Sequence, residues 1–270
     1  MNDQPFDTVG RVQLAAPEPV ASGYAAWEWT PVSCYAASTT WRLHYPGDGD
    51  RYLKVRRADE FPGLPAEARR TWWAGGHLSV PDVIDEGTDG RVDWLVTTAL
   101  DGQPATDPEL GEPRQVVIAL AEGLRRFHDA APMTDCPFEF RIATAMAHVH
   151  HRVTAGLVDP AEDFDDEHQH LDAVGVWRRL KRLQPADEEL VVCHGDYCPP
   201  NALLTGGRVT GYVDLGELGV ADRWWDLGVA TRAITWNYGP GLEGLFLAAY
   251  GAAPDPQRQA FYRLLYDLAS

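Results

Sequence analysis

The feature that most constrains the fold of this chain is a short series of polar residues. The segment His194-Gly195-Asp196 is followed by Asn201, five positions after the aspartate, and later by Asp214. Between Asn201 and Asp214, two short apolar segments flank the turn-forming sequence Thr205-Gly206-Gly207-Arg208, a pattern typical of a β-hairpin. Because a hairpin returns the chain to its starting point, we expect Asn201 at its entrance and Asp214 at its exit to lie near Asp196.

These side chains have the chemistry that phosphoryl transfer requires. The reaction needs a carboxylate that holds the attacking hydroxyl and oxygen ligands that hold Mg²⁺ against the nucleotide phosphates. We therefore expect Asp196 to be the catalytic residue and Asn201 and Asp214 to be the metal ligands. The sequence contains no Gly-x-x-x-x-Gly-Lys-Ser/Thr loop, so a lysine elsewhere must bind the phosphates. Lys54 on a predicted strand and Glu67 on the next predicted helix are the candidate pair.

The distribution of predicted elements indicates an α+β protein. The first third of the chain is rich in strand patterns, at residues 39–45, 51–56, 81–87 and 94–98. A helix is predicted over 65–74, where the segment begins with proline and ends before two glycines. From about residue 112 the pattern becomes helical, with apolar residues at 117, 120, 121, 124 and 127 on one helix face. We predict a nucleotide-binding domain at residues 1–99 and a catalytic, acceptor-binding domain at residues 100–270.

Composition narrows the range of partners. The net charge of −17 argues against nucleic-acid binding. It either favours cationic ligands through long-range attraction or serves only solubility. No apolar run approaches the roughly 20 residues of a membrane span, and the N-terminus lacks the pattern of a signal peptide, so we expect a cytoplasmic protein. The four cysteines are scattered, which in that compartment predicts reduced thiols.

Several further segments carry a resemblance to a known family. They are residues 191–201 around Asp196, Gly219-Val220-Ala221-Asp222-Arg223 with Asp226, the C-terminal Ala260-Phe261-Tyr262-Arg263-Leu264-Leu265, and shorter matches at 136–138, 156–159 and 167–169. Through these segments the chain resembles the aminoglycoside 3′-phosphotransferases over residues 40–268. The resemblance implies a protein-kinase-like, two-lobed fold, with an antiparallel sheet and a helix in the N-lobe and a mostly helical C-lobe. It also implies transfer of the γ-phosphate of ATP or GTP to an antibiotic hydroxyl, which confers resistance.

The resemblance assigns roles to individual residues. Asp196 corresponds to the catalytic base, Asn201 and Asp214 to the Mg²⁺ ligands, and Lys54 with Glu67 to the phosphate-binding pair. Thr98 and Leu100 fall where the backbone of the family meets adenine, and Ser38 is expected to contact the triphosphate although residues 33–38 lack the usual glycine. The expected contacts to a cationic acceptor are Asp163, Asp165 and Asp166 in an acidic segment, together with Glu217, Arg232 and Asp267.

Departures from the family leave the acceptor open. Relatives tend to have arginine at the position of Glu217 and acids at the positions of Ala233 and Tyr266. One alternative is a kinase of the same fold that acts on the streptomycin 3″-hydroxyl, a nucleoside antibiotic or a small metabolite. Another is a pseudokinase that binds a ligand without catalysis. The sequence does not indicate the nucleotide preference, the hydroxyl that is modified or the oligomeric state.

Overall fold

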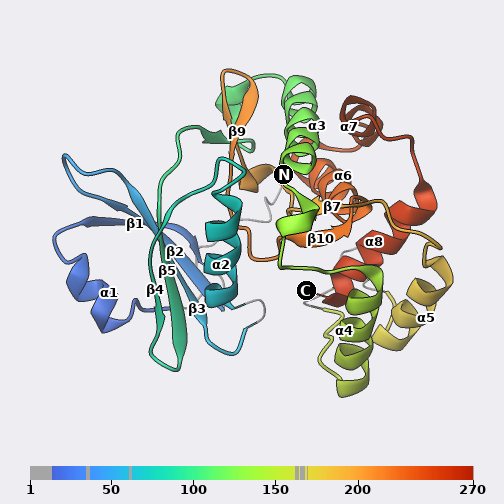
Figure 1. The fold of residues 1–270 in the computed structure, drawn as a ribbon, viewed down its shortest axis with the longest axis horizontal. Helices are drawn as coiled ribbons and strands as arrows, with labels where there is room; N and C mark the ends of the chain where they lie inside the picture. The colour runs from blue at the N-terminus through green and yellow to red at the C-terminus, as the bar shows by residue number, and fades with distance from the viewer. Residues whose placement is uncertain are drawn as a thin grey trace. The chain divides into compact units, whose positions relative to one another are not determined.

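The computed structural model describes residues 14–34, 37–60, 63–161, 164, 168 and 170–269. The chain divides into two compact units (Figure 1). The first comprises Met1–Gly76 and Val80–Leu100, and the second comprises His77–Ser79 and Asp101–Ser270. The first unit is built on a sheet and the second is mostly helical, so the predicted α+β composition is confirmed.

The first unit contains a five-stranded antiparallel sheet with the strand order β1-β2-β3-β5-β4. Its strands are β1 (Glu28–Cys34), β2 (Ser38–His44), β3 (Arg51–Arg57), β4 (Val83–Thr88) and β5 (Val92–Thr98), and its helices are α1 (Glu18–Gly23) and α2 (Leu64–Ala74). Four strands and α2 were predicted within a few residues of these bounds. Strand β1 was not predicted, because Pro31 lies within it. The proline is accommodated since β1 is an edge strand with a register shift between Pro31 and Ser33.

The two faces of this sheet are packed differently. Successive residues of a strand point to opposite faces, so Leu53 and Val55 point to one face and Lys54 to the other. Leu53 and Val55 belong to a cluster of buried side chains on the first face. On the other face Leu95, the sheet partner of Lys54, packs against Leu64 and Ala68 of α2. Lys54 is therefore placed on the face that α2 covers.

The second unit is a helical assembly with two small sheets. Its helices are α3 (Pro113–Ala130), α4 (Ile142–Ala155), α5 (Ala173–Leu183), α6 (Trp224–Tyr238), α7 (Glu243–Tyr250) and α8 (Pro256–Ala269), with short 3₁₀ segments η1 (Pro108–Leu110), η2 (Met133–Asp135) and η3 (Pro199–Asn201). One sheet has the order β6-β8-β9, formed by β6 (Gln103–Pro104), β8 (Ala202–Thr205) and β9 (Arg208–Tyr212). The other pairs β7 (Leu190–Cys193) with β10 (Gly219–Asp222) in antiparallel register. The predicted hairpin is thus confirmed as β8 and β9, whose register pairs residues 202–205 with 208–212.

Helix α6 is the buried centre of the second unit. All of its residues from Trp224 to Ile234 are buried, which is expected of a helix covered on every side. In Figure 1 it lies among α3, α7 and α8, and its contacts with α7 and α8 are extensive. Its N-terminus follows β10 directly, so the first turn of α6 begins beside the sheet that leads into the 194–201 segment. Among the described residues, no helix has both the length and the apolar character needed to cross a membrane.

Candidate active site

The candidate active site is built on residues 194–201, which join β7 to β8 and are called the Asp196 loop below. Gly195 has a φ of +94°, a left-handed conformation that residues with a Cβ atom adopt only under strain. A Cβ atom at this position would also overlap the backbone and side chain of Glu217. Glycine therefore lets the chain turn just before Asp196 and lie directly against the segment that follows Asp214.

The first turn of α6 holds the backbone of the Asp196 loop. The carboxylate of Asp226 accepts hydrogen bonds from the backbone N–H of His194 at 2.7 Å and of Gly195 at 2.9 Å. It also accepts from Nε2 of His128 on α3 at 2.9 Å, and Trp225 Nε1 donates to the Gly195 carbonyl at 2.6 Å. Asp226 is fully buried, so every one of these bonds is shielded from water. The start of the loop is consequently fixed by side chains from two helices.

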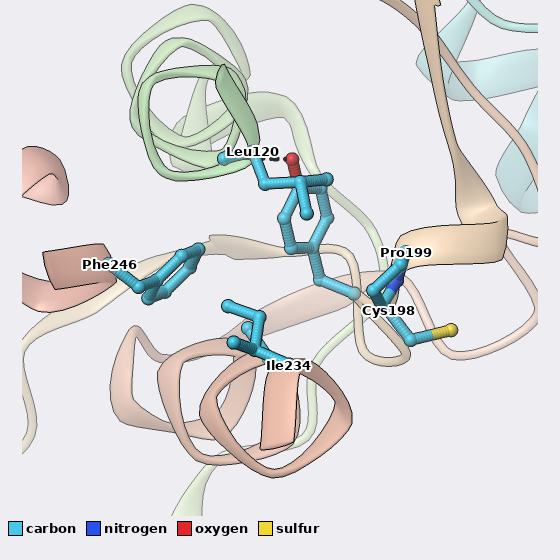
Figure 2. A pocket seen from close by; sticks show the side chains of 7 residues that line it. Leu120, Cys198, Pro199, Ile234 and Phe246 are labelled. Carbon is cyan, nitrogen blue, oxygen red and sulfur yellow. Dashed lines mark hydrogen bonds between the residues drawn. The ribbon is translucent and has the colours of Figure 1, made fainter. Parts of the chain in front are cut away.

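The later part of the loop rests on apolar side chains. Figure 2 shows Leu120 of α3, Ile234 of α6 and Phe246 of α7, which line one space together with Cys198 and Pro199. The space that these residues enclose has no room for a water-sized molecule. This side of the Asp196 loop is therefore a packed support rather than a ligand pocket.

The carboxylate of Asp196 is held at both oxygens. Asn201 Nδ2 donates to Oδ2 at 3.0 Å and also to the Asp196 carbonyl at 3.0 Å. The hydroxyl of Tyr266, from α8, donates to Oδ1 at 3.2 Å. Burial, followed by the nearby carboxylate of Asp214, raises the pKa of Asp196. The result is a carboxylate with a defined orientation and an increased affinity for a proton.

Backbone contacts bring Asp214 to the same place. The N–H of Val213 donates to the carbonyl of Asn201 at 3.0 Å, and His194 Nε2 donates to the carbonyl of Val213 at 3.1 Å. Nδ1 of the same histidine accepts from the Asp196 N–H at 3.3 Å, which assigns the hydrogen to Nε2. Asp214 has a φ of +60° and is the one non-glycine residue with positive φ among the described residues. Such strained backbone is concentrated at functional sites.

Asn201 and Asp214 offer the oxygen donors that Mg²⁺ prefers. Because the amide nitrogen of Asn201 is engaged by Asp196, its amide oxygen is the atom left to coordinate a metal. Asp214 is exposed, and its carboxylate supplies oxygen donors. These residues fit the predicted metal, and their assignment as ligands stays a prediction.

The residues predicted to bind the nucleotide lie in the first unit. Lys54 Nζ and Glu67 Oε2 form an ion pair at 2.9 Å, with side chains that are 15% and 7% exposed. Ser38 is buried at the start of β2. Thr98 is the last residue of β5, and its hydroxyl accepts a hydrogen bond from the backbone N–H of Asp82. Leu100 is the last residue of the first unit. The structure thus pairs Lys54 with Glu67, and nucleotide contact by all five residues stays a prediction.

The residues predicted to contact the acceptor lie in different parts of the chain. Asp163, Asp165 and Asp166 lie outside the described residues. Asp267 is 1% exposed; its carboxylate pairs with Arg232 and lies 2.6 Å from Nδ1 of His168. Glu217 lies against Gly195, next to Asp196. The structure therefore brings Arg232 and Asp267 together as a buried ion pair and places Glu217 beside the Asp196 loop.

Sequence reasoning missed three side chains at this site and gave Asp226 no role. His128 continues the apolar face of α3, and a buried histidine on such a face needs a polar partner, so a signal for it existed. Trp225 gave no comparable signal, and Tyr266 was noted only as a position where relatives tend to have an acid. Tyr266 is separated from Asp196 by 70 residues, and no local pattern connects them.

The profile described as the phosphotransferase enzyme family matches residues 28–262. The chain belongs to this family. It is 40% identical over 211 residues to an aminoglycoside 3′-phosphotransferase of Streptomyces fradiae, a match that covers 75% of this chain and 78% of the relative. Membership confirms the prediction of a phosphotransferase.

Solved structures of the phosphotransferase family are also similar. A crystal structure of an aminoglycoside-3′-phosphotransferase of type VIII matches with a TM-score of 0.81 and 35% identity, over 93% of this chain and 96% of that one. An aminoglycoside phosphotransferase from Streptomyces rimosus, in complex with ADP and streptomycin, matches with a TM-score of 0.75 and 30% identity, over 93% and 95%. These matches confirm the predicted resemblance and the protein-kinase-like α+β fold.

Proposed function

We propose that this protein transfers the γ-phosphate of ATP or GTP, with Mg²⁺, to the 3′-hydroxyl of an aminoglycoside antibiotic and so confers resistance. The observation that carries the chemistry is the Asp196 carboxylate, held by Asn201 while a backbone bond from Val213 keeps Asp214 beside the same loop. Relatives named aminoglycoside 3′-phosphotransferases support the acceptor class.

The proposed reaction places Asp196 against the acceptor. The acceptor hydroxyl donates to the carboxylate, which directs the hydroxyl oxygen toward the γ-phosphorus. A bond forms between these two atoms, the bond from the γ-phosphorus to the bridging oxygen breaks, and the nucleoside diphosphate leaves with the electron pair. The proton of the hydroxyl passes to Asp196. Mg²⁺, when bound, neutralises phosphate charge, and Asn201 and Asp214 would hold it.

On the nucleotide side we assign phosphate binding to Lys54. Its ion pair with Glu67 on the α2-covered face of the sheet restricts the ammonium group to one position. Ser38 is proposed to contact the triphosphate, and the chain at Thr98 and Leu100 to contact adenine. The ADP complex of the Streptomyces rimosus relative supports an adenine nucleotide. A cytoplasmic location, where nucleoside triphosphates are available, is part of the same proposal.

On the acceptor side we assign the binding of amino groups to carboxylates. Asp163, Asp165, Asp166 and Glu217 are the proposed direct contacts, and the net charge of −17 would attract a cationic antibiotic. We assign Arg232 and Asp267 an indirect part in acceptor binding, because they form a buried ion pair in which Asp267 is only 1% exposed.

The streptomycin 3″-hydroxyl is the second candidate. Two observations favour it: the carboxylate of Asp267 is already engaged by Arg232 and His168, and a relative of similar structure was solved with streptomycin. A panel of aminoglycosides that carry or lack a 3′-hydroxyl, with streptomycin added, separates the two acceptors. Release of ADP or GDP is measured with each nucleotide and each acceptor.

The central test uses Asp196→Asn in the same assay. We expect turnover to fall at least about 10³-fold because the amide cannot accept the proton, while nucleotide binding measured by calorimetry persists. Asp129→Asn, which neutralises an exposed carboxylate on α3, is the matched control and should retain wild-type turnover. A near-wild-type rate for Asp196→Asn would refute the catalytic assignment, and phosphorylation of no aminoglycoside by the wild type would refute the acceptor class.

A further inference from the structure

The phenol of Tyr266 completes the support of the Asp196 carboxylate. Oδ2 is held by Asn201 at 3.0 Å and Oδ1 by the Tyr266 hydroxyl at 3.2 Å. A carboxylate that is bonded at one oxygen only can still swing about the bond between Cβ and Cγ. Bonds at both oxygens, from residues on two different elements, leave it one orientation.

The ring of Tyr266 is itself fixed by its surroundings. The guanidinium of Arg232 lies over the Tyr266 ring and over the Trp236 ring, 5.0 Å from the centre of each, so it makes a cation–π contact with both. Arg232 is 6% exposed and forms a buried ion pair with Asp267, one residue along α8 from Tyr266. Trp225, whose Nε1 donates to the Gly195 carbonyl, also contacts the ring, with centroids 6.2 Å apart. Movement of the phenol would therefore disrupt a buried charge pair.

We propose that Tyr266 is a positioning residue for phosphoryl transfer, and that Arg232 and Asp267 act on the reaction by fixing its ring. This inference rests on the proposed role of Asp196 as the group that orients the acceptor hydroxyl. A carboxylate oxygen has two lone pairs, so Oδ1 can accept from the phenol and from the acceptor hydroxyl together. The phenol holds Oδ1 in place without adding a second negative charge next to the reacting atoms.

The expected signature is a loss in turnover without a loss in binding. Tyr266→Phe removes the hydroxyl and keeps the ring, so we expect kcat to fall about tenfold. KM values for nucleotide and acceptor should stay within about twofold, because the inference assigns the Tyr266 hydroxyl to Asp196 and not to either substrate. Tyr262→Phe is the matched control: Tyr262 lies four residues earlier on α8, is 2% exposed, and its hydroxyl lies beside Asp222 rather than Asp196. That variant should keep the wild-type kcat.

A double-mutant cycle tests the role of the stacked arginine. Arg232→Lys keeps the positive charge and loses the planar group that stacks on the rings. We expect it to lower kcat by a factor between about two and ten. Because both changes act through the same carboxylate, Tyr266→Phe combined with Arg232→Lys should be no slower than Tyr266→Phe alone.

Three outcomes would overturn the inference. They are an unchanged kcat in Tyr266→Phe, an equal loss in Tyr262→Phe, and multiplicative losses in the double variant. A wild type that phosphorylates no acceptor contradicts the proposed function instead. In that case the crystal structure of Tyr266→Phe decides: a rotated Asp196 carboxylate supports positioning by Tyr266, and an unmoved one excludes it.

Discussion

At the scale of single residues, two glycines have the same kind of backbone conformation but different surroundings. Comparing them distinguishes the need for a left-handed φ from the need for close approach of another segment. Gly195 and Gly206 both have positive φ, at +94° and +58°. Gly206 lies in the β8–β9 turn with open space around it, whereas a Cβ atom at Gly195 would overlap Glu217. The first glycine is therefore needed for conformation and for close approach, and the second for conformation alone.

This difference predicts unequal effects of alanine. Gly206→Ala should lower the free energy of unfolding by about 1 kcal/mol, the cost of a Cβ in the left-handed region, and leave kcat unchanged. Gly195→Ala should cost at least about 2 kcal/mol more because the loop must also move away from Glu217, and kcat should fall at least about 100-fold. Urea denaturation and steady-state kinetics measure both quantities. Equal effects of the two substitutions would show that contact with Glu217 is unimportant.

The juxtaposition of Asp196, Asn201 and Asp214 was predictable because it is local. Asn201 follows Asp196 by five residues, and the hairpin that returns the chain to Asp214 has a clear turn sequence. The approach of Tyr266 was not predictable, since it depends on how α8 packs against α6. The buried pairing of Arg232 with Asp267 was missed for the same reason, and both residues were predicted individually as acceptor contacts.

At the scale of elements, the first turn of α6 acts as the anchor of the Asp196 loop. Asp226 alone accepts from two backbone N–H groups of the loop and from His128. The two N–H groups that Asp226 binds cannot turn to solvent, because Asp226, His194 and His128 are all buried. An acceptor with two oxygens is therefore required at this position.

Substitution of Asp226 by asparagine should test this anchor. In Asp226→Asn the new NH₂ group faces N–H donors, so at least one buried donor loses its partner, at a cost of about 1–3 kcal/mol in the free energy of unfolding. We also expect kcat to fall, since the displaced donors lie in the loop that carries Asp196. Thermal denaturation followed by circular dichroism, together with kinetics, measures both effects. Glu243→Gln, on the neighbouring α7 and away from the loop, is the comparison. Full stability and activity of Asp226→Asn would show that the loop is held by its apolar support instead.

Sequence periodicity identified elements whose partners are near in sequence. The strands β2 and β3 and the helix α2 were found from alternation and helix-end signals. The pairing of β7 with β10 was not found, because each strand has only four residues and 25 residues lie between Cys193 and Gly219, their nearest ends. Such pairing is decided by the packing of the Asp196 loop between them rather than by either strand alone.

At the scale of the whole molecule, charge is the property that bears on the acceptor. The formal charge of −17 arises from 40 acidic and 23 basic residues. A field of this sign attracts a polycation over distances of roughly a Debye length, about 10 Å at 0.1 M salt. The same field gives no advantage to a neutral acceptor, so salt dependence distinguishes the proposed aminoglycoside from a neutral nucleoside antibiotic or metabolite.

We therefore expect kcat/KM for a cationic acceptor to fall by about tenfold as salt rises from about 0.05 M to about 0.5 M. The fall should appear in KM, because screening weakens attraction before the chemical step and leaves kcat nearly constant. Neutralising the acidic segment with Asp163→Asn, Asp165→Asn and Asp166→Asn together should flatten the salt dependence. The control variant Asp129→Asn removes one charge on α3 and should show the same salt dependence of kcat/KM as the wild type. If the triple variant and the wild type show the same dependence, attraction comes from the molecule as a whole and the acidic segment does not contact the acceptor.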